Sequence, residues 1–169
     1  MSSRAGSVRP RFLAPRALLA LGLSLALALA VEVVAGIVTR PAVPGWYAAL
    51  AKPAFTPPNW VFPVVWTVLF VLMAVAVWLV WLRKGVRGAP MSMALYAAQL
   101  AFNLGWSVLF FGLRQPASAL AGIVFLVVLI LATMVSFHRN RPVAAWLMLP
   151  YLAWVAYALV LNAAIVGMN

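Results

Sequence analysis

The stretch 117–137 reads ASALAGIVFLVVLILATMVSF, which is 21 residues without one charged side chain. A helix needs about 20 consecutive, mostly apolar residues to cross a bilayer. Four further stretches meet this criterion, and proline, glycine or basic residues separate them; they cover residues 17–38, 58–82, 91–113 and 143–166. The sequence therefore predicts an all-α membrane protein, a five-transmembrane-helix bundle. Its single domain, 17–169, follows a basic segment, 1–16, and its longest connection is residues 39–57, here called loop 1.

The composition of the 169-residue chain excludes several other classes of protein. It is 67% hydrophobic and 8% charged, whereas soluble domains carry about 25% charged residues. The net charge is +11, but the basic residues are scattered between apolar blocks and form no patch, so we expect no nucleic-acid partner. With no cysteine, one histidine and one acid, the chain has no thiolate metal site and little material for hydrolytic catalysis. We expect no metal and no required cofactor.

The lysines and arginines predict how the chain crosses the membrane. With five spans, nine of the twelve fall on one side and three on the other. Because basic residues favour the cytoplasmic side, the N-terminus is predicted to be cytoplasmic and the C-terminus external. As a separate expectation, the membrane is a bacterial cell membrane. The nine are Arg4, Arg9, Arg11, Arg16, Arg83, Lys84, Arg87, Arg139 and Arg141, and the three are Arg40, Lys52 and Arg114.

The first stretch has a second interpretation. Four arginines before a Leu/Ala run, with Ala28-Leu29-Ala30 as a cleavage site, resemble a signal peptide. The apolar run is longer than the 7–15 residues of a signal peptide, which favours a retained first helix.

The predicted helix 91–113 has two contrasting faces. One face carries the polar and aromatic residues Tyr96, Gln99, Asn103 and Trp106. Lipid cannot satisfy the two amides, so they must find protein, water or ligand partners. The other face carries Ala97, Ala101 and Gly105, and small residues at this spacing let helices approach closely, within the bundle or across a dimer.

Aromatic residues of three helices converge near loop 1. Trp66, Trp106, Trp154 and Tyr157 all lie roughly 10–18 Å from the same predicted surface, at 1.5 Å per residue. Such stripes are normally packing, but their shared depth favours a pocket for a flat, mostly apolar ligand that needs a few polar contacts. Tryptophan and tyrosine would stack on the faces of this ligand, and Asn103 and Gln99 would bond its edge.

Loop 1 contains Trp46 and Tyr47, which can serve either as a binding face or as interfacial anchors. The run Thr56-Pro57-Pro58 predicts a helix start with Thr56 as N-cap.

Two ionisable residues lie outside these patterns. Glu32 is an acid within the first span, which is a functional hypothesis by default, although snorkelling or pairing with Arg40 is favoured. His138, beside Arg139 at a helix end, is interpreted as an interfacial residue rather than a haem ligand.

Three blocks resemble the translocator protein family, also called TspO/MBR or peripheral benzodiazepine receptor. They are WYAALAKPAFTPPNWVFPVVW (46–66), YAAQLAFNLGWSVLFFG (96–112) and LPYLAWVAYALVLN (149–162). The resemblance implies a five-helix bundle, commonly a homodimer, with an outer-half pocket capped by loop 1. The ligands it implies are porphyrins such as protoporphyrin IX, cholesterol in eukaryotic members, and synthetic isoquinoline carboxamides and benzodiazepines.

The resemblance also assigns pocket residues. By motif position they are Tyr47, Trp66, Asn103, Trp106, Ala153 and Trp154, while Gln99 and Tyr157 join them from the helix faces. Trp146 and Trp154 match tryptophans linked in bacterial relatives to light-dependent porphyrin breakdown. Two departures stand out: Phe55 replaces the usual tryptophan of KPxW, and no basic residue follows Tyr157, which breaks the eukaryotic cholesterol motif and argues against a sterol.

The resulting hypothesis is a membrane receptor or binding protein for porphyrin-like tetrapyrroles, with a sensory or regulatory role. One alternative is photo-oxidative degradation of the bound porphyrin, with Trp146 and Trp154 as electron donors. Another is transport of porphyrin or sterol-like ligands, against which stand the absence of a visible inverted repeat and the single intramembrane acid.

Overall fold

The computed structural model describes residues 11–169, so the predictions that concern Arg4 and Arg9 lie outside the described residues. Within that range the protein has five apolar helical segments long enough to cross a membrane, and no strand. The segments are Pro15–Tyr47, Val61–Gly88, Pro90–Gly112, Pro116–Asn140 and Pro142–Met168. The prediction of an all-α, five-helix membrane bundle is confirmed.

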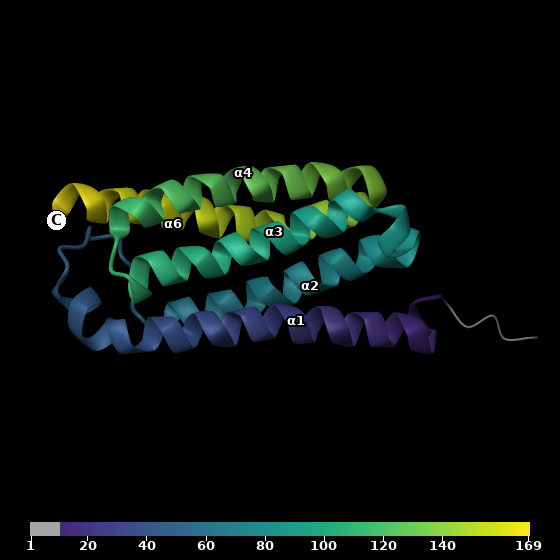
Figure 1. The fold of residues 1–169 in the computed structure, drawn as a ribbon, viewed down its shortest axis with the longest axis horizontal. Helices are drawn as coiled ribbons and strands as arrows, with labels where there is room; N and C mark the ends of the chain where they lie inside the picture. Colours follow the sequence, from purple (N-terminus) through teal and green to yellow (C-terminus); the bar gives the residue numbers. More distant parts are fainter. Residues whose placement is uncertain (1–10) are drawn as a thin grey trace, which may run out of the picture.

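Several of these segments contain more than one element. The elements are η1 (Arg11–Leu13), α1 (Pro15–Thr39), η2 (Arg40–Ala42), η3 (Val43–Tyr47), α2 (Val61–Gly88), α3 (Pro90–Ser107), η4 (Val108–Gly112), α4 (Pro116–Asn140), α5 (Pro142–Leu147) and α6 (Leu149–Met168). Figure 1 shows the long helices side by side, with α1 against α2 and α4 against both α3 and α6. Loop 1 and the end of α6 lie at one end of the bundle, and the turns α2–α3 and α4–α5 lie at the other.

Prolines and one glycine set the ends of the helices. A proline stands in the first turn of α1, α3, α4, α5 and α6, where its missing N–H costs nothing. Near its end α2 bends at Gly85, whose φ of 66° favours glycine. Between α5 and α6 the chain turns at Met148, because Pro150 cannot donate the helical hydrogen bond of that turn. The fifth apolar segment is therefore broken two residues before Pro150.

The predicted start of the second helix is wrong. The helix α2 begins at Val61 after Trp60, which makes no side-chain cap, and the Thr56 hydroxyl instead donates to the Pro53 carbonyl oxygen at 2.7 Å. A proline disfavours the helical conformation for the residue before it, and both Thr56 and Pro57 precede a proline. The helix can start only after that run. At the other end of loop 1, the first helical segment continues to Tyr47, so the irregular part is shorter than predicted.

Glu32 does not pair with Arg40. Its carboxylate accepts a hydrogen bond from the Thr67 hydroxyl on α2. Arg40 lies beyond the end of α1 and is exposed, whereas Thr67 comes from the helix that packs against α1. The contact links α1 to α2. His138 is exposed in the last turn of α4.

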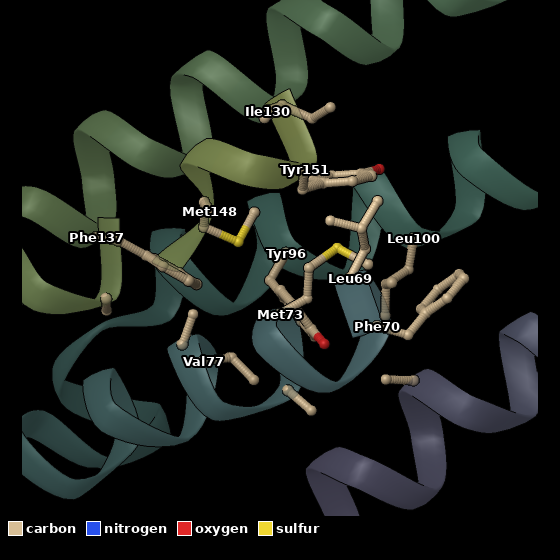
Figure 2. Close-up of a cluster of buried hydrophobic side chains, with 14 of the residues drawn as sticks. Leu69, Phe70, Met73, Val77, Tyr96, Leu100, Ile130, Phe137, Met148 and Tyr151 are labelled. Carbon is tan, nitrogen blue, oxygen red and sulfur yellow. The ribbon is translucent and has the colours of Figure 1, made fainter. Parts of the chain in front are cut away.

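The core lies between α2, α3, α4 and α6 and is dominated by large side chains (Figure 2). Phe70 and Met73 of α2 meet Leu100 of α3 there, and Met148 and Tyr151 enter from the α5–α6 break. Met73, Met148 and Tyr151 are fully buried. This packing adjoins the site described next, since Leu69 belongs to both.

Candidate ligand-binding site

A groove of about 520 Å³ lies between α2 and α6 and is here called the α2–α6 groove. Its α2 wall is open to the outside of the bundle, since Val64 and Val68 are both more than half exposed. Almost all of its surface is apolar, so it suits an apolar ligand. The lining residues are Val64, Val65, Val68, Leu69, Pro150, Ala153, Trp154 and Tyr157.

Trp154 supplies the one buried polar atom of this wall that lacks a partner. Its indole Nε1 is buried and finds no hydrogen-bond acceptor among residues 11–169. Its ring packs edge-on against Phe62 at 5.9 Å and lies tilted to Tyr157 at 5.6 Å between ring centroids. An indole N–H is a donor only, so this atom requires an acceptor to be satisfied.

Behind the groove, in the outer half of the core, a hydrogen bond and two aromatic contacts link α2, α3 and α6. Asn103 donates from Nδ2 to the Tyr151 hydroxyl at 3.2 Å, and both residues are buried. Trp66 packs edge-on against Tyr151, with 6.2 Å between ring centroids, and tilted to Phe70 at 5.8 Å. These contacts fix the side chains relative to one another, and the amide nitrogen of Asn103 is occupied by its hydrogen bond to Tyr151.

A second cavity lies next to loop 1 and measures only about 30 Å³. Such a volume is close to that of one water molecule. An aromatic cluster fills the surrounding space: Trp106 stacks on Phe110 at 5.3 Å, and Phe110 contacts Phe111 at 4.8 Å. This cavity is lined by Tyr47, Phe62, Trp106, Phe110, Phe111, Ala158, Leu161, Asn162 and Ile165.

Loop 1 is fastened to α6 at two points. The Tyr157 hydroxyl donates to the Phe55 carbonyl oxygen at 2.7 Å. Asn169 pairs with the backbone of Ala51 twice, accepting its N–H and donating to its carbonyl, each at 3.0 Å. Within the loop, Lys52 Nζ donates to three backbone carbonyls, those of residues 47, 48 and 50, at 2.7 to 3.0 Å. We call the Asn169–Ala51 pair the α6 clasp.

The sequence model of the TspO/MBR family matches residues 24–168. The chain belongs to the TspO/MBR family. It is 39% identical over 156 residues to "Tryptophan-rich protein TspO" of Chlorobaculum tepidum, which covers 90% of this chain and 97% of that protein. It is 40% identical over 119 residues to the "Translocator protein" of Homo sapiens, covering 69% and 70%. It is also 42% identical over 117 residues to the "Tryptophan-rich sensory protein" of Cereibacter sphaeroides, covering 69% and 72%.

Family membership and the five apolar helices make this TspO/MBR protein an integral, multi-pass membrane protein. The residues that sequence reasoning assigned to one pocket lie in three places. Ala153, Trp154 and Tyr157 line the α2–α6 groove; Tyr47 and Trp106 line the small cavity; Trp66, Gln99 and Asn103 lie in the core or against it.

Trp146, the second predicted electron donor, belongs to none of these places. It lies on α5, before the break at Met148, and is 65% exposed. Neither cavity includes it in its lining.

Sequence reasoning did not single out Tyr151 and Asn162 of this TspO/MBR protein. Asn162 accepts from Trp106 Nε1 at 3.1 Å and donates to the Pro116 carbonyl oxygen at 2.9 Å. A signal was available, because Asn162 is the only side-chain amide between residues 143 and 166, and lipid would not satisfy it.

The small-residue face of α3 does not pack inside the protomer. Ala97 and Ala101 are exposed, and a Cβ added at Gly105 would meet no atom within 4 Å. Of the two roles considered from the sequence, contact within the bundle is therefore not supported.

Proposed function

We propose that this TspO/MBR protein is a membrane receptor for porphyrin-like tetrapyrroles of the protoporphyrin IX class, and that the α2–α6 groove holds the ligand. The carrying observation is the groove itself: its volume of about 520 Å³ lies within the 300–1,000 Å³ of small-molecule sites, and Trp154 and Tyr157 form its wall. The porphyrin is the ligand, and no further cofactor is required.

The wall matches the chemistry of a flat conjugated ring. Trp154 and Tyr157 offer aromatic surface, and Val64 and Val68 on the opposite side offer apolar contact. The partnerless Nε1 of Trp154 would donate to a polar edge atom of the ligand. A sensory role is supported by the "Tryptophan-rich sensory protein" of Cereibacter sphaeroides, which is 42% identical to this chain.

The proposal is tested by titrating the purified protein, in lipid nanodiscs, with protoporphyrin IX and following the Soret absorbance. We expect Trp154→Ala to weaken binding about tenfold or more, since loss of one buried stacking contact corresponds to about 1.4 kcal/mol. Trp146→Ala is the matched control, because it removes the same side chain from an exposed position outside the groove. Equal affinities of wild type and Trp154→Ala would refute the site, and no saturable shift in wild type would refute the function.

A second candidate is light-dependent oxidation of the bound porphyrin by dioxygen. It is favoured by one observation: two oxidisable rings, those of Trp154 and Tyr157, lie 5.6 Å apart in the groove wall. Under illumination in air, this candidate predicts a loss of Soret absorbance that Trp154→Phe slows and that Trp146→Phe leaves unchanged. If bound porphyrin loses its Soret absorbance no faster than free porphyrin under the same light, the oxidation candidate is refuted and only binding is supported.

The basic residues also support a topology for the chain in the membrane. We infer a cytoplasmic end at the α2–α3 and α4–α5 turns, because five of the described cations, Arg83, Lys84, Arg87, Arg139 and Arg141, gather there.

A homodimer in the bilayer would use the exposed face of Ala97, Ala101 and Gly105, where small residues allow close approach. Cross-linking in nanodiscs should show a dimer that Gly105→Leu abolishes.

A further inference from the structure

The buried face of α3 is a row of polar side chains. Its buried residues are Ser92, Tyr96, Gln99, Leu100, Asn103 and Ser107, and all but one of them are polar. They recur every three or four residues, so they form one face along the helix. In a membrane interior each of their polar atoms needs a partner inside the protein.

Residues on both sides of the middle of this row bond to other side chains of the protein. At the inner end, Ser92 shares a hydrogen bond with Ser136 at 2.7 Å and accepts one from Asn140 at 3.0 Å. Toward loop 1, Asn103 bonds to Tyr151. These contacts show that the row is built to pair with neighbouring helices.

The middle of the row is not satisfied. The Tyr96 hydroxyl and Gln99 Oε1 are buried and have no partner among residues 11–169. Gln99 is fully buried, and its amide nitrogen reaches only the sulfur of Met73, at 3.9 Å. Tyr96 lies in the same core cluster as Met73 (Figure 2). Native proteins rarely leave such atoms unpaired, so two on one face indicate a bound group.

The two atoms are complementary. The Tyr96 hydroxyl can donate, and Gln99 Oε1 accepts. Residues three apart on a helix are neighbours on one face, and a single O–H group can accept from one of these atoms and donate to the other. The buried polar residues of this core carry no charge, so a charged group would be uncompensated there.

We propose that Tyr96 and Gln99 form an internal site for a neutral O–H group, which accepts from the Tyr96 hydroxyl and donates to Gln99 Oε1. The group is either an internal water molecule or a hydroxyl or protonated acid of a ligand that reaches the core. The site is separate from the α2–α6 groove, whose lining includes neither residue. Only the ligand source rests on the proposed function.

The experiment compares Tyr96→Phe with Tyr151→Phe, two removals of a buried hydroxyl from the same core. Tyr151 has a protein partner, so its variant sets the size of the effect, an expected fall in Tm of about 2–4 °C. Thermal unfolding is followed by intrinsic tryptophan fluorescence of the ligand-free protein. If water fills the site, Tyr96→Phe and Gln99→Met each lower Tm by a similar amount, and the double variant falls by less than both effects added.

A second measurement identifies the ligand source. Unchanged Tm in the ligand-free variants, combined with a severalfold loss of protoporphyrin IX affinity, assigns the group to the ligand. If Tyr96→Phe is as stable as wild type or more so, and affinity is also unchanged, the atoms are unpaired and the proposal is overturned. The stability comparison needs no ligand, so it is valid whether or not porphyrin binds.

Discussion

Asn162 on α6 joins three helical segments, and its replacement gives a direct test of the outer core. The residue is 1% exposed, and it bonds to Trp106 near the end of α3 and to Pro116 at the start of α4. Asn162→Leu keeps a similar volume, but it removes both hydrogen bonds and leaves the indole N–H of Trp106 without an acceptor.

The magnitude follows from the two bonds. Hydrogen bonds between transmembrane helices contribute about 0.6 kcal/mol on average and up to about 1.7 kcal/mol. Two such bonds, together with one buried donor left unpaired, correspond to about 2 kcal/mol. For a chain of this length, this loss lowers Tm by about 4–8 °C.

The assay is thermal unfolding in detergent, with Ala163→Leu as the matched control, since it adds the same side chain at the exposed neighbouring position. A cycle with Trp106→Phe and the double variant isolates the coupling between residues 106 and 162, expected at about 0.6–1.7 kcal/mol. A coupling of zero, or a fall in Tm no larger than that of the control, would refute this account of the outer core.

Three further predictions concern other parts of the chain. Asn169→Ala opens the α6 clasp, so hydrogen exchange at the Ala51 amide should rise about fivefold; mass spectrometry would reveal an unchanged rate if the clasp contributed nothing. Gly85→Ala places a side chain at φ 66°, which should cost about 1–3 kcal/mol in denaturant unfolding, whereas the control Gly22→Ala, within α1, should be neutral or slightly stabilising; equal effects would contradict the role of φ. Glu32→Leu removes the hydrogen bond between α1 and α2 and should lower the unfolding free energy by about 1 kcal/mol, and a variant as stable as wild type would show that this bond is dispensable.

The five-helix fold could be predicted because the signal is local and repeated. Each span is a continuous apolar run, and no long-range contact is needed to recognise it. The start of α2 was predicted wrongly because the conformational restriction from two consecutive prolines competes with the capping preference of Thr56, and the restriction dominates.

The candidate site was harder to predict because residue type and depth do not say which partner a side chain takes. Asn103 has the composition and depth of a ligand-binding amide, yet it bonds to Tyr151 from α6. Space near loop 1 is filled by Phe110 and Phe111, whose positions depend on tertiary packing. The role of Trp146 could not be judged from spacing either, since the break at Met148 separates its helix from that of Trp154.

Because the α2–α6 groove is open on its α2 side, the ligand concentration that determines its occupancy is the concentration in the lipid phase and not that in water. The groove faces the outside of the helix bundle, where the surrounding phase is lipid, while the α6 clasp and the Tyr157–Phe55 bond hold loop 1 across the aqueous end. A hydrophobic molecule would reach it by lateral diffusion after dissolving in the bilayer. Occupancy of the groove would therefore depend on the mole fraction of the molecule in lipid, and so on its partition coefficient. Lipid acyl chains would compete for the groove, and their local concentration stays constant when the aqueous ligand concentration is changed.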